Sequence, residues 1–123
     1  MKEYIFLLRG YPNHLTLEET QQLRLQWGRL VPRWREEKKF VEGYIFSDDG
    51  HTIEGAPERL VNDKTVIEHG MQAAGFVIIL AADMEEALQL AKLCPLLDFG
   101  GTVEVRERVP QPAVTTVQQT TFQ

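Results

Sequence analysis

Residues 75–82 read GFVIILAA, and the chain continues over residues 83–106 as DMEEALQLAKLCPLLDFGGTVEVR. The first run is apolar and rich in β-branched and aromatic residues, which predicts an inner strand. Asp83 follows, with Glu86 three residues later, a spacing typical of a capping box at the start of a helix. Pro95 limits the length of that helix, and Gly100-Gly101 predicts a turn. The stretch therefore predicts a complete strand-helix-strand unit.

The second strand of this unit, residues 102–109, alternates strictly between two kinds of side chain. One face carries Val103, Val105, Glu107 and Val109, and the other carries Thr102, Glu104, Arg106 and Arg108. A wholly polar face either meets solvent or lines a site. For an antiparallel or edge strand, the simpler interpretation is contact with solvent.

The first half of the chain predicts a similar unit. Residues 2–9 form a strand that is largely apolar on both faces, and residues 41–46 form a second strand. Between them, Thr16 and Glu19 predict a capping box for a helix over residues 17–40, in which Pro32 predicts a kink or break beside Gly28. A strand that is apolar on both faces must be covered on both, which predicts helices on one side and a partner subunit on the other.

The connection over residues 47–69 is predicted as short strands and turns. Asp49-Gly50 is a hairpin signal, so residues 51–54 are expected to turn back as a short strand. Further edge pieces are expected at residues 60–61 and 65–69. Two strand-helix-strand units, over residues 2–46 and 75–109, predict an α+β fold with a ferredoxin-like β-α-β repeat and an antiparallel sheet.

Several of these residues also carry a family resemblance. Cys94-Pro95, Gly100-Gly101 and the VEVR of residues 103–106, after a strand and a helix beginning at Asp83, resemble the C-terminal half of the YCII-related family. Proteins of that family often carry an Asp-Gly-Pro-Phe-x-Glu-x-Lys-Glu segment, of which this chain matches Asp63 and Glu68 and departs at residues 64–66 and 70–71. The resemblance implies a ferredoxin-like domain over residues 1–109 that pairs into a dimeric α/β barrel. Residues 110–123 are expected to be a tail that is flexible or packed on the partner subunit.

Composition narrows the classes of function. The 123 residues suit one domain, and the formal net charge of -5 argues against a nucleic-acid-binding protein. Residues 24–39 are locally basic, with six Lys or Arg against two Glu, and are interpreted as a solvated helix face, with an anion-binding or partner-docking patch as the alternative. The sequence shows no membrane helix or signal peptide, so a cytoplasmic location is expected. The single cysteine, Cys94, is interpreted as a buried apolar residue, with a reactive thiol as the alternative.

Motifs for chemistry are sparse. The three histidines, His14, His51 and His69, form no zinc-binding spacing, so neither a metal nor a cofactor is expected. Part of the wider family resembles enzymes that use a histidine-aspartate pair, but the first helix here has Gln26 and Trp27 near the place of the histidine. A glutamine is not a general base near neutral pH.

The facing patterns predict a cleft near the dimer sheet. Its expected ligand-binding residues are Arg9, Trp27, Trp34, Glu104 and Arg106, with Glu68 also on its polar side. The favoured hypothesis is a small-molecule-binding or regulatory homodimer. The alternative is a cofactorless dimeric-barrel enzyme, with His69, Asp63 or Glu68 as catalytic candidates and an arginine that stabilises negative charge. A purely structural assembly role is the third hypothesis.

Overall fold

The structure is a computed structural model, and it describes residues 1–109. The predicted tail, residues 110–123, lies outside the described residues. Along the chain the elements are β1 (Lys2–Gly10), α1 (Leu17–Glu36), β2 (Phe40–Ile45), β3 (Thr52–Glu54), β4 (Leu60–Asn62), β5 (Gln72–Ala81), α2 (Met84–Ala91), the 3-10 helix η1 (Pro95–Phe99) and β6 (Thr102–Glu107).

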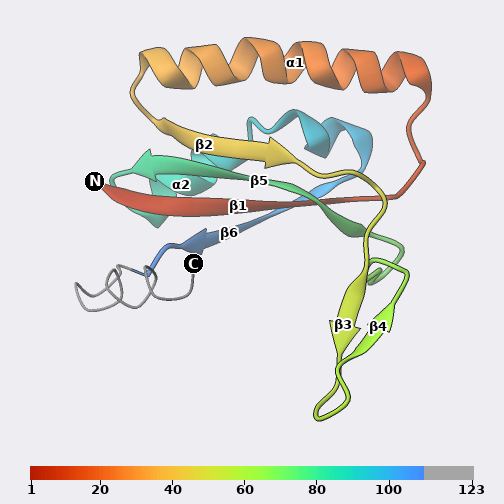
Figure 1. The fold of residues 1–123 in the computed structure, drawn as a ribbon. Coiled ribbons are helices and arrows are strands. Elements are labelled where there is room, and N and C mark those ends of the chain that lie inside the picture. Colours follow the sequence, from red (N-terminus) through yellow and green to blue (C-terminus); the bar gives the residue numbers. More distant parts are fainter. Residues whose placement is uncertain (110–123) are drawn as a thin grey trace.

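The main sheet has four strands in the order β2-β5-β1-β6, and every neighbouring pair is antiparallel. Both helices lie on one side of it (Figure 1). The prediction of an α+β fold with an antiparallel sheet is confirmed, and the strand order is compatible with the ferredoxin-like arrangement. Strand β6 lies at an edge of the sheet.

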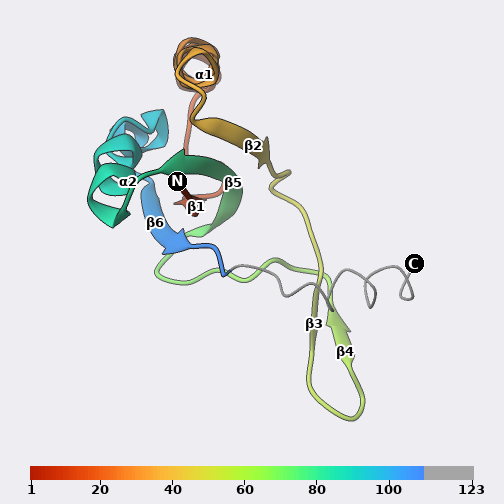
Figure 2. The same ribbon diagram turned by 90° about the vertical axis from the view of Figure 1, so that its left-hand side faces the viewer.

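The helix starts follow the predicted caps. At α1, the Thr16 hydroxyl accepts a hydrogen bond from the Glu19 amide, and the Glu19 carboxylate accepts one from the Thr16 amide, so the capping box is complete. At α2, Asp83 caps the amide of Glu86, but the Glu86 carboxylate accepts from Ala82 instead. The expected break at Pro32 is absent, since α1 runs continuously through it, and Figure 2 looks along the helix with its turns superposed.

The hydrophobic core fills the space between the helices and the sheet. Alternate residues of β1 and β5 supply its floor, namely Tyr4, Phe6, Leu8, Val77, Ile79 and Ala81. Leu30 and Trp34 of α1, together with Ala87, Leu90 and Ala91 of α2, pack onto them. The Trp34 ring meets the Phe6 ring edge-on, with centroids 6.3 Å apart. One of the two apolar faces of β1 is therefore covered by the helices of the same chain.

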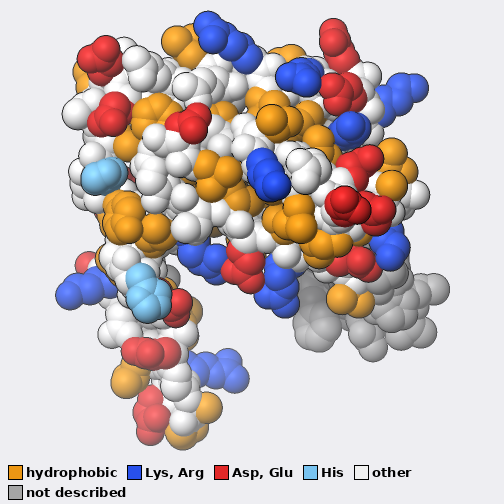
Figure 3. Space-filling view, turned by 180° about the vertical axis from the view of Figure 1, so that it is seen from behind, with side chains coloured by type: hydrophobic (Ala, Val, Ile, Leu, Met, Phe, Trp, Pro, Cys, Tyr) orange, Lys and Arg blue, Asp and Glu red, His pale blue; other side chains and the backbone are white. Residues whose placement is uncertain are grey.

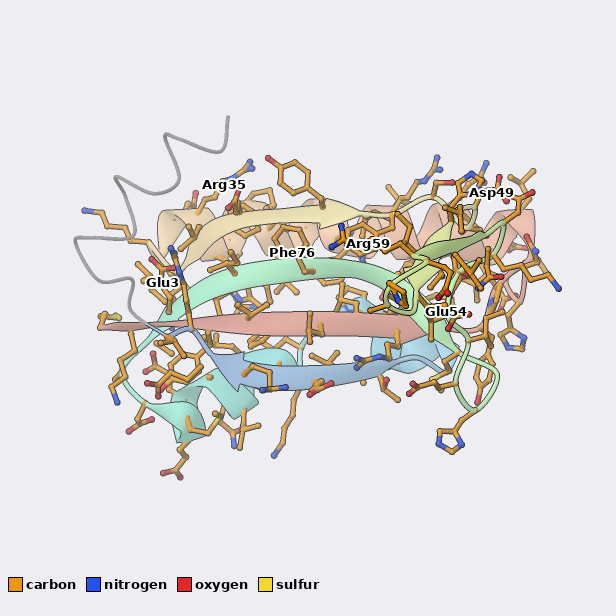
Figure 4. The ribbon with its side chains drawn as sticks, turned by 60° about the horizontal axis from the view of Figure 1, so that its bottom comes forward. Glu3, Arg35, Asp49, Glu54, Arg59 and Phe76 are labelled. Atoms are coloured by element: carbon orange, nitrogen blue, oxygen red, sulfur yellow. The ribbon has the colours of Figure 1, made fainter. Side chains whose placement is uncertain are left out.

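The other face of the sheet, here called the open face, has an apolar centre and a charged edge. Its centre consists of Ile5, Leu7, Phe76, Ile78 and Leu80, all partly exposed, with Tyr44 beside Phe76. Its edge on β6 carries Glu104 and Arg106, which are paired in register with Leu7 and Ile5. Figure 4 looks onto this face, and among residues 1–109 no helix covers it.

The connection between β2 and β5 is the main departure from the predicted elements. Strand β3 was expected to pair back through a turn at Asp49-Gly50, but it pairs with β4 in a separate two-stranded sheet whose turn lies over residues 55–59. Gly55 and Arg59 supply left-handed conformations at that turn. Residues 65–69 form no strand, and only an isolated bridge joins Glu68 to Met71. We call residues 47–67 the arm, because they stand away from the main sheet (Figures 1 and 2).

Candidate functional site

A pocket of about 520 Å³ lies between the first half of α1 and the sheet end at which β1 stops and β5 starts. We call it the α1 pocket. The loop after β1, helix α1, the segment after β2, the start of β5 and η1 all contribute to its lining. Its position at the ends of several elements is typical of small-molecule sites, which need side chains from separate segments to converge.

One wall of the α1 pocket is apolar. Leu23 and Trp27 of α1 face the same way because residues four apart lie on the same side of a helix. Opposite lie Phe46, Leu96 and Phe99. These side chains offer a flat aromatic body room to pack against Trp27.

The polar groups of the α1 pocket are organised by Gln72, which is 4% exposed. Its amide nitrogen donates to a carboxylate oxygen of Asp48 at 3.2 Å, and its amide oxygen accepts from the Thr65 hydroxyl at 2.6 Å. Both ends of the buried amide are therefore satisfied, and Asp48 is held at the pocket margin. Arg24 and His14, both exposed, also line the pocket, and the His14 ring lies 5.4 Å from that of Tyr11.

The expected ligand-binding residues are divided between two faces of the molecule. Trp27 lies in the α1 pocket and is partly buried. Trp34, two turns further along α1, is 1% exposed and belongs to the core. Arg9, Glu104 and Arg106 lie on the open face, and the structure does not bring them to either tryptophan.

On the open face these three residues form a charged cluster. The Glu104 carboxylate accepts from Arg9 at 2.7 Å and from Arg106 at 3.2 Å. The hydrogen bond from Arg9 and then that from Arg106 hold the pKa of Glu104 below its ordinary value. The carboxylate is already paired with two guanidinium groups, which makes it a structural part of the sheet edge.

The catalytic candidates lie apart from the α1 pocket. Asp63 is in the arm, 3.0 Å from His51, with its side chain 91% exposed. Glu68 and His69 lie in a tight turn closed by mutual backbone hydrogen bonds between Glu68 and Met71, and both are exposed. His14 and His51 are exposed as well, so no histidine occupies a closed pocket.

Metal and thiol chemistry find no support in residues 1–109. Over that range no three His, Cys, Asp or Glu side chains gather in a way that could hold a metal ion. Cys94 is buried, and burial raises the pKa of its thiol to about 12. The thiolate is therefore strongly disfavoured in the folded protein.

Sequence reasoning missed four residues of the α1 pocket, His14, Arg24, Asp48 and Gln72. Arg24 precedes Trp27 by three positions and so shares its side of the helix, a signal that the helical spacing contained. Gln72 carried no such signal. Its amide can be buried only because Asp48 and Thr65 bond to it, and those residues come from the arm.

Comparison with known proteins adds little to this geometry. No protein-family model and no curated protein matches the chain. The chain is similar to the crystal structure of a hydantoinase/carbamoylase family amidase from Burkholderia ambifaria, with 11% identity and a TM-score of 0.32. The match covers 90% of this chain and 29% of that one, so this chain spans less than a third of the amidase. Similarity at this level does not indicate a shared activity.

A helix that crosses a membrane must be both long and apolar. Among the described residues, no helix is both long and apolar enough to span a bilayer.

Proposed function

We propose that the protein is a small-molecule-binding homodimer that takes its ligand in the α1 pocket. The observation that carries this proposal is the buried Gln72 amide, which fixes Asp48 at the margin of a pocket walled by Trp27 and other apolar side chains. A few fixed polar groups beside apolar walls are the usual composition of a ligand site, and about 520 Å³ lies within the usual size range.

The lining favours a particular kind of ligand. Trp27, Phe46 and Phe99 suit a flat apolar body, while Arg24 and Asp48 carry opposite charges at the polar side. A metabolite with an aromatic or aliphatic body and a carboxylate satisfies Arg24, and a hydrogen-bond donor on the same molecule satisfies Asp48.

The homodimer is supported by the open face. Phe76 and Ile78 of β5, with Ile5 and Leu7 of β1, form a contiguous apolar surface at the centre of a four-stranded sheet. Exposed apolar surfaces of this kind mark interaction sites, and two such sheets packed face to face bury each other. This pairing would form the dimeric α/β barrel that the YCII resemblance implies. Membership of that family and a cytoplasmic location stay predictions.

The three catalytic candidates named from the sequence gain no supporting observation. A general base must lie within hydrogen-bond reach of a bound substrate, in an environment that tunes its pKa. His69, Asp63 and Glu68 are exposed and lie outside the α1 pocket. We therefore do not propose catalysis by these residues.

A thermal-shift screen against small carboxylates with apolar bodies tests the ligand site. A ligand at 100 times its dissociation constant stabilises the folded protein by about 2.7 kcal/mol, which raises the melting temperature by roughly 10 °C for a domain of this size. Arg24→Ala is expected to reduce the shift, whereas Arg29→Ala, an exposed arginine of the same helix outside the α1 pocket, is expected to retain it. If active compounds shift both variants equally, or if no compound shifts the wild type, the proposed site is wrong.

A further inference from the structure

We infer that the arm clasps a second copy of this chain, so that each subunit of the homodimer holds the other at one end of the paired sheets. This inference rests on the homodimer of the proposed function but not on ligand binding. It assigns a role to residues 47–67, which the α1 pocket uses only at their base, through Asp48 and Thr65.

Apart from its base, where Asp48 and Thr65 bond to Gln72, the arm is held mainly by contacts within itself. Its two strands, three residues each, pair with one another in a sheet separate from the main one. An isolated two-stranded hairpin is at best marginally stable in water. The arm nevertheless exposes half or more of five apolar side chains, Ile53, Leu60, Val61, Val66 and Ile67. Figure 3 shows hydrophobic and charged side chains along a projection that stands away from the body of the molecule.

The arm stands on the same side of the main sheet as the open face. Figures 1 and 2 show it leaving the end of β2 and pointing away from the helices, and in Figure 4 it rises toward the viewer over one end of the open face. The open face and the arm therefore make an L. A partner that packs on the open face must also contact the arm.

The arm is longer than the distance between two sheets packed face to face. From Phe46 to the turn at Ala56 the chain advances ten residues, or roughly 30 Å if extended. Two sheets packed face to face lie only about 10 Å apart. In a face-to-face pair the arm consequently reaches past the sheet of the second molecule and along its flank.

Two-fold symmetry gives a second copy a definite place on the open face and beside the arm. When the two-fold axis lies in the interface and runs across the strands, the arms fall at opposite ends of the pair. Each arm then flanks the partner's far end, where β1 begins and α1 ends. Because the contact is isologous, both subunits use the same two surfaces, the open face and the arm.

Charge favours this arrangement. The arm, residues 47–67, carries five acidic side chains and two basic ones, whereas residues 33–39, at the far end of α1, carry four basic and two acidic. Figure 4 shows Asp49 and Glu54 at the arm end of the molecule and Arg35 at the far end. The two-fold pairing brings the acidic arm of one copy toward the basic helix end of the other, so opposite charges approach at both ends. The sequence left open that the basic residues 24–39 dock a partner. In the proposed dimer that partner is the arm of the second subunit.

Sedimentation equilibrium over a wide concentration range tests the clasp with two matched variants. Leu60→Glu places a charge on the arm, and Leu25→Glu places the same charge on the outer surface of α1, where the leucine is similarly exposed at 60% against 63%. We expect the wild type and Leu25→Glu to dimerise alike, and Leu60→Glu to raise the dimer dissociation constant at least tenfold. Circular dichroism checks that both variants stay folded.

Hydrogen exchange supplies a measurement that does not depend on a variant. The amides of Ile53 and Val61 are expected to be protected at concentrations where the protein is dimeric, and to exchange rapidly when it is diluted to the monomer. A dimer whose dissociation constant is unchanged by Leu60→Glu, or whose arm amides exchange rapidly, overturns the clasp and leaves the open-face dimer in place. A wild-type monomer at every concentration overturns both clasp and dimer, while the thermal-shift screen still decides ligand binding separately.

Discussion

At the scale of single residues, two glycines of this chain have opposite roles. A Cβ added at Gly75 in β5 would collide with the Tyr44 carbonyl oxygen of the neighbouring strand, whereas one added at Gly28 in α1 would meet nothing within 4 Å. Gly75→Ala is therefore expected to lower the free energy of unfolding by about 1–3 kcal/mol, because strands β2 and β5 must separate locally.

Gly28→Ala is the natural control for that experiment. Alanine is the better helix former, so this change is expected to raise the free energy of unfolding by roughly 0.5–1 kcal/mol. Urea unfolding of both variants measures the two effects. A neutral Gly75→Ala would mean that β2 is not held against β5 as the register shows.

Cys94 gives a pH-dependent prediction. Burial raises the pKa of its thiol to about 12 in the folded protein, above that of an exposed thiol at about 8.5. The unfolded chain thus loses this proton first as pH rises, so the stabilising contribution is complete below about pH 8.5 and is lost progressively toward pH 12. The free energy of unfolding of the wild type is expected to fall more steeply over this range than that of Cys94→Ala. Equal slopes would show that the thiol is not buried.

At the scale of single elements, the N-terminal cap of α1 is expected to contribute measurably to stability. Thr16→Ala removes the hydroxyl that accepts from the Glu19 amide, which is expected to cost about 1 kcal/mol of stability. The Thr16 backbone amide and, to a smaller extent, the Thr16 hydroxyl hold the Glu19 pKa below its ordinary value, so removal of the hydroxyl is expected to raise that pKa only in part in an NMR titration. Thr16→Ser retains the hydroxyl and is expected to change neither quantity appreciably.

Elements whose signals are local were predicted correctly from the sequence. The caps at Thr16 and Asp83 are properties of short segments and mark real helix starts. The apolar run after Gly75 does form a strand, but β5 begins earlier, at Gln72. The arm was predicted poorly because Asp49-Gly50 is a good turn signal, yet β3 finds its partner six to ten residues later in β4. Which of two short segments pairs with a strand depends on tertiary context and not on the turn dipeptide.

The α1 pocket shows the same limit for a site. Trp27 and Trp34 are seven residues apart and share a helix face, so the sequence treats them alike. In the folded chain Trp34 lies over Phe6, in the middle of the sheet, and is buried, whereas Trp27 lies near the sheet end and lines the pocket. Distinguishing them requires the position of the helix along the sheet, which no local pattern contains.

At the scale of the whole molecule, dimerisation through the open face and the arm has a thermodynamic signature. If unfolding separates the subunits, the melting temperature is expected to rise with protein concentration by mass action. Added salt is expected to weaken the part of the association that comes from the acidic arm and the basic end of α1, because about 1 M salt shortens the screening length to about 3 Å. Scanning calorimetry at several protein and salt concentrations measures both trends. A melting temperature independent of protein concentration would argue for a monomer.

The place of β1 between β5 and β6 affects when the sheet can fold during synthesis of the chain. Strand β1 emerges from the ribosome early, but its hydrogen-bonding neighbours begin at Gln72 and Thr102. At typical rates of about 5–20 residues per second, β1 waits several seconds for its first neighbour and longer for its second. During that interval Phe6, Leu8 and the residues between them have no sheet to join. The main sheet can therefore be completed only after β6, its last strand, has been synthesised.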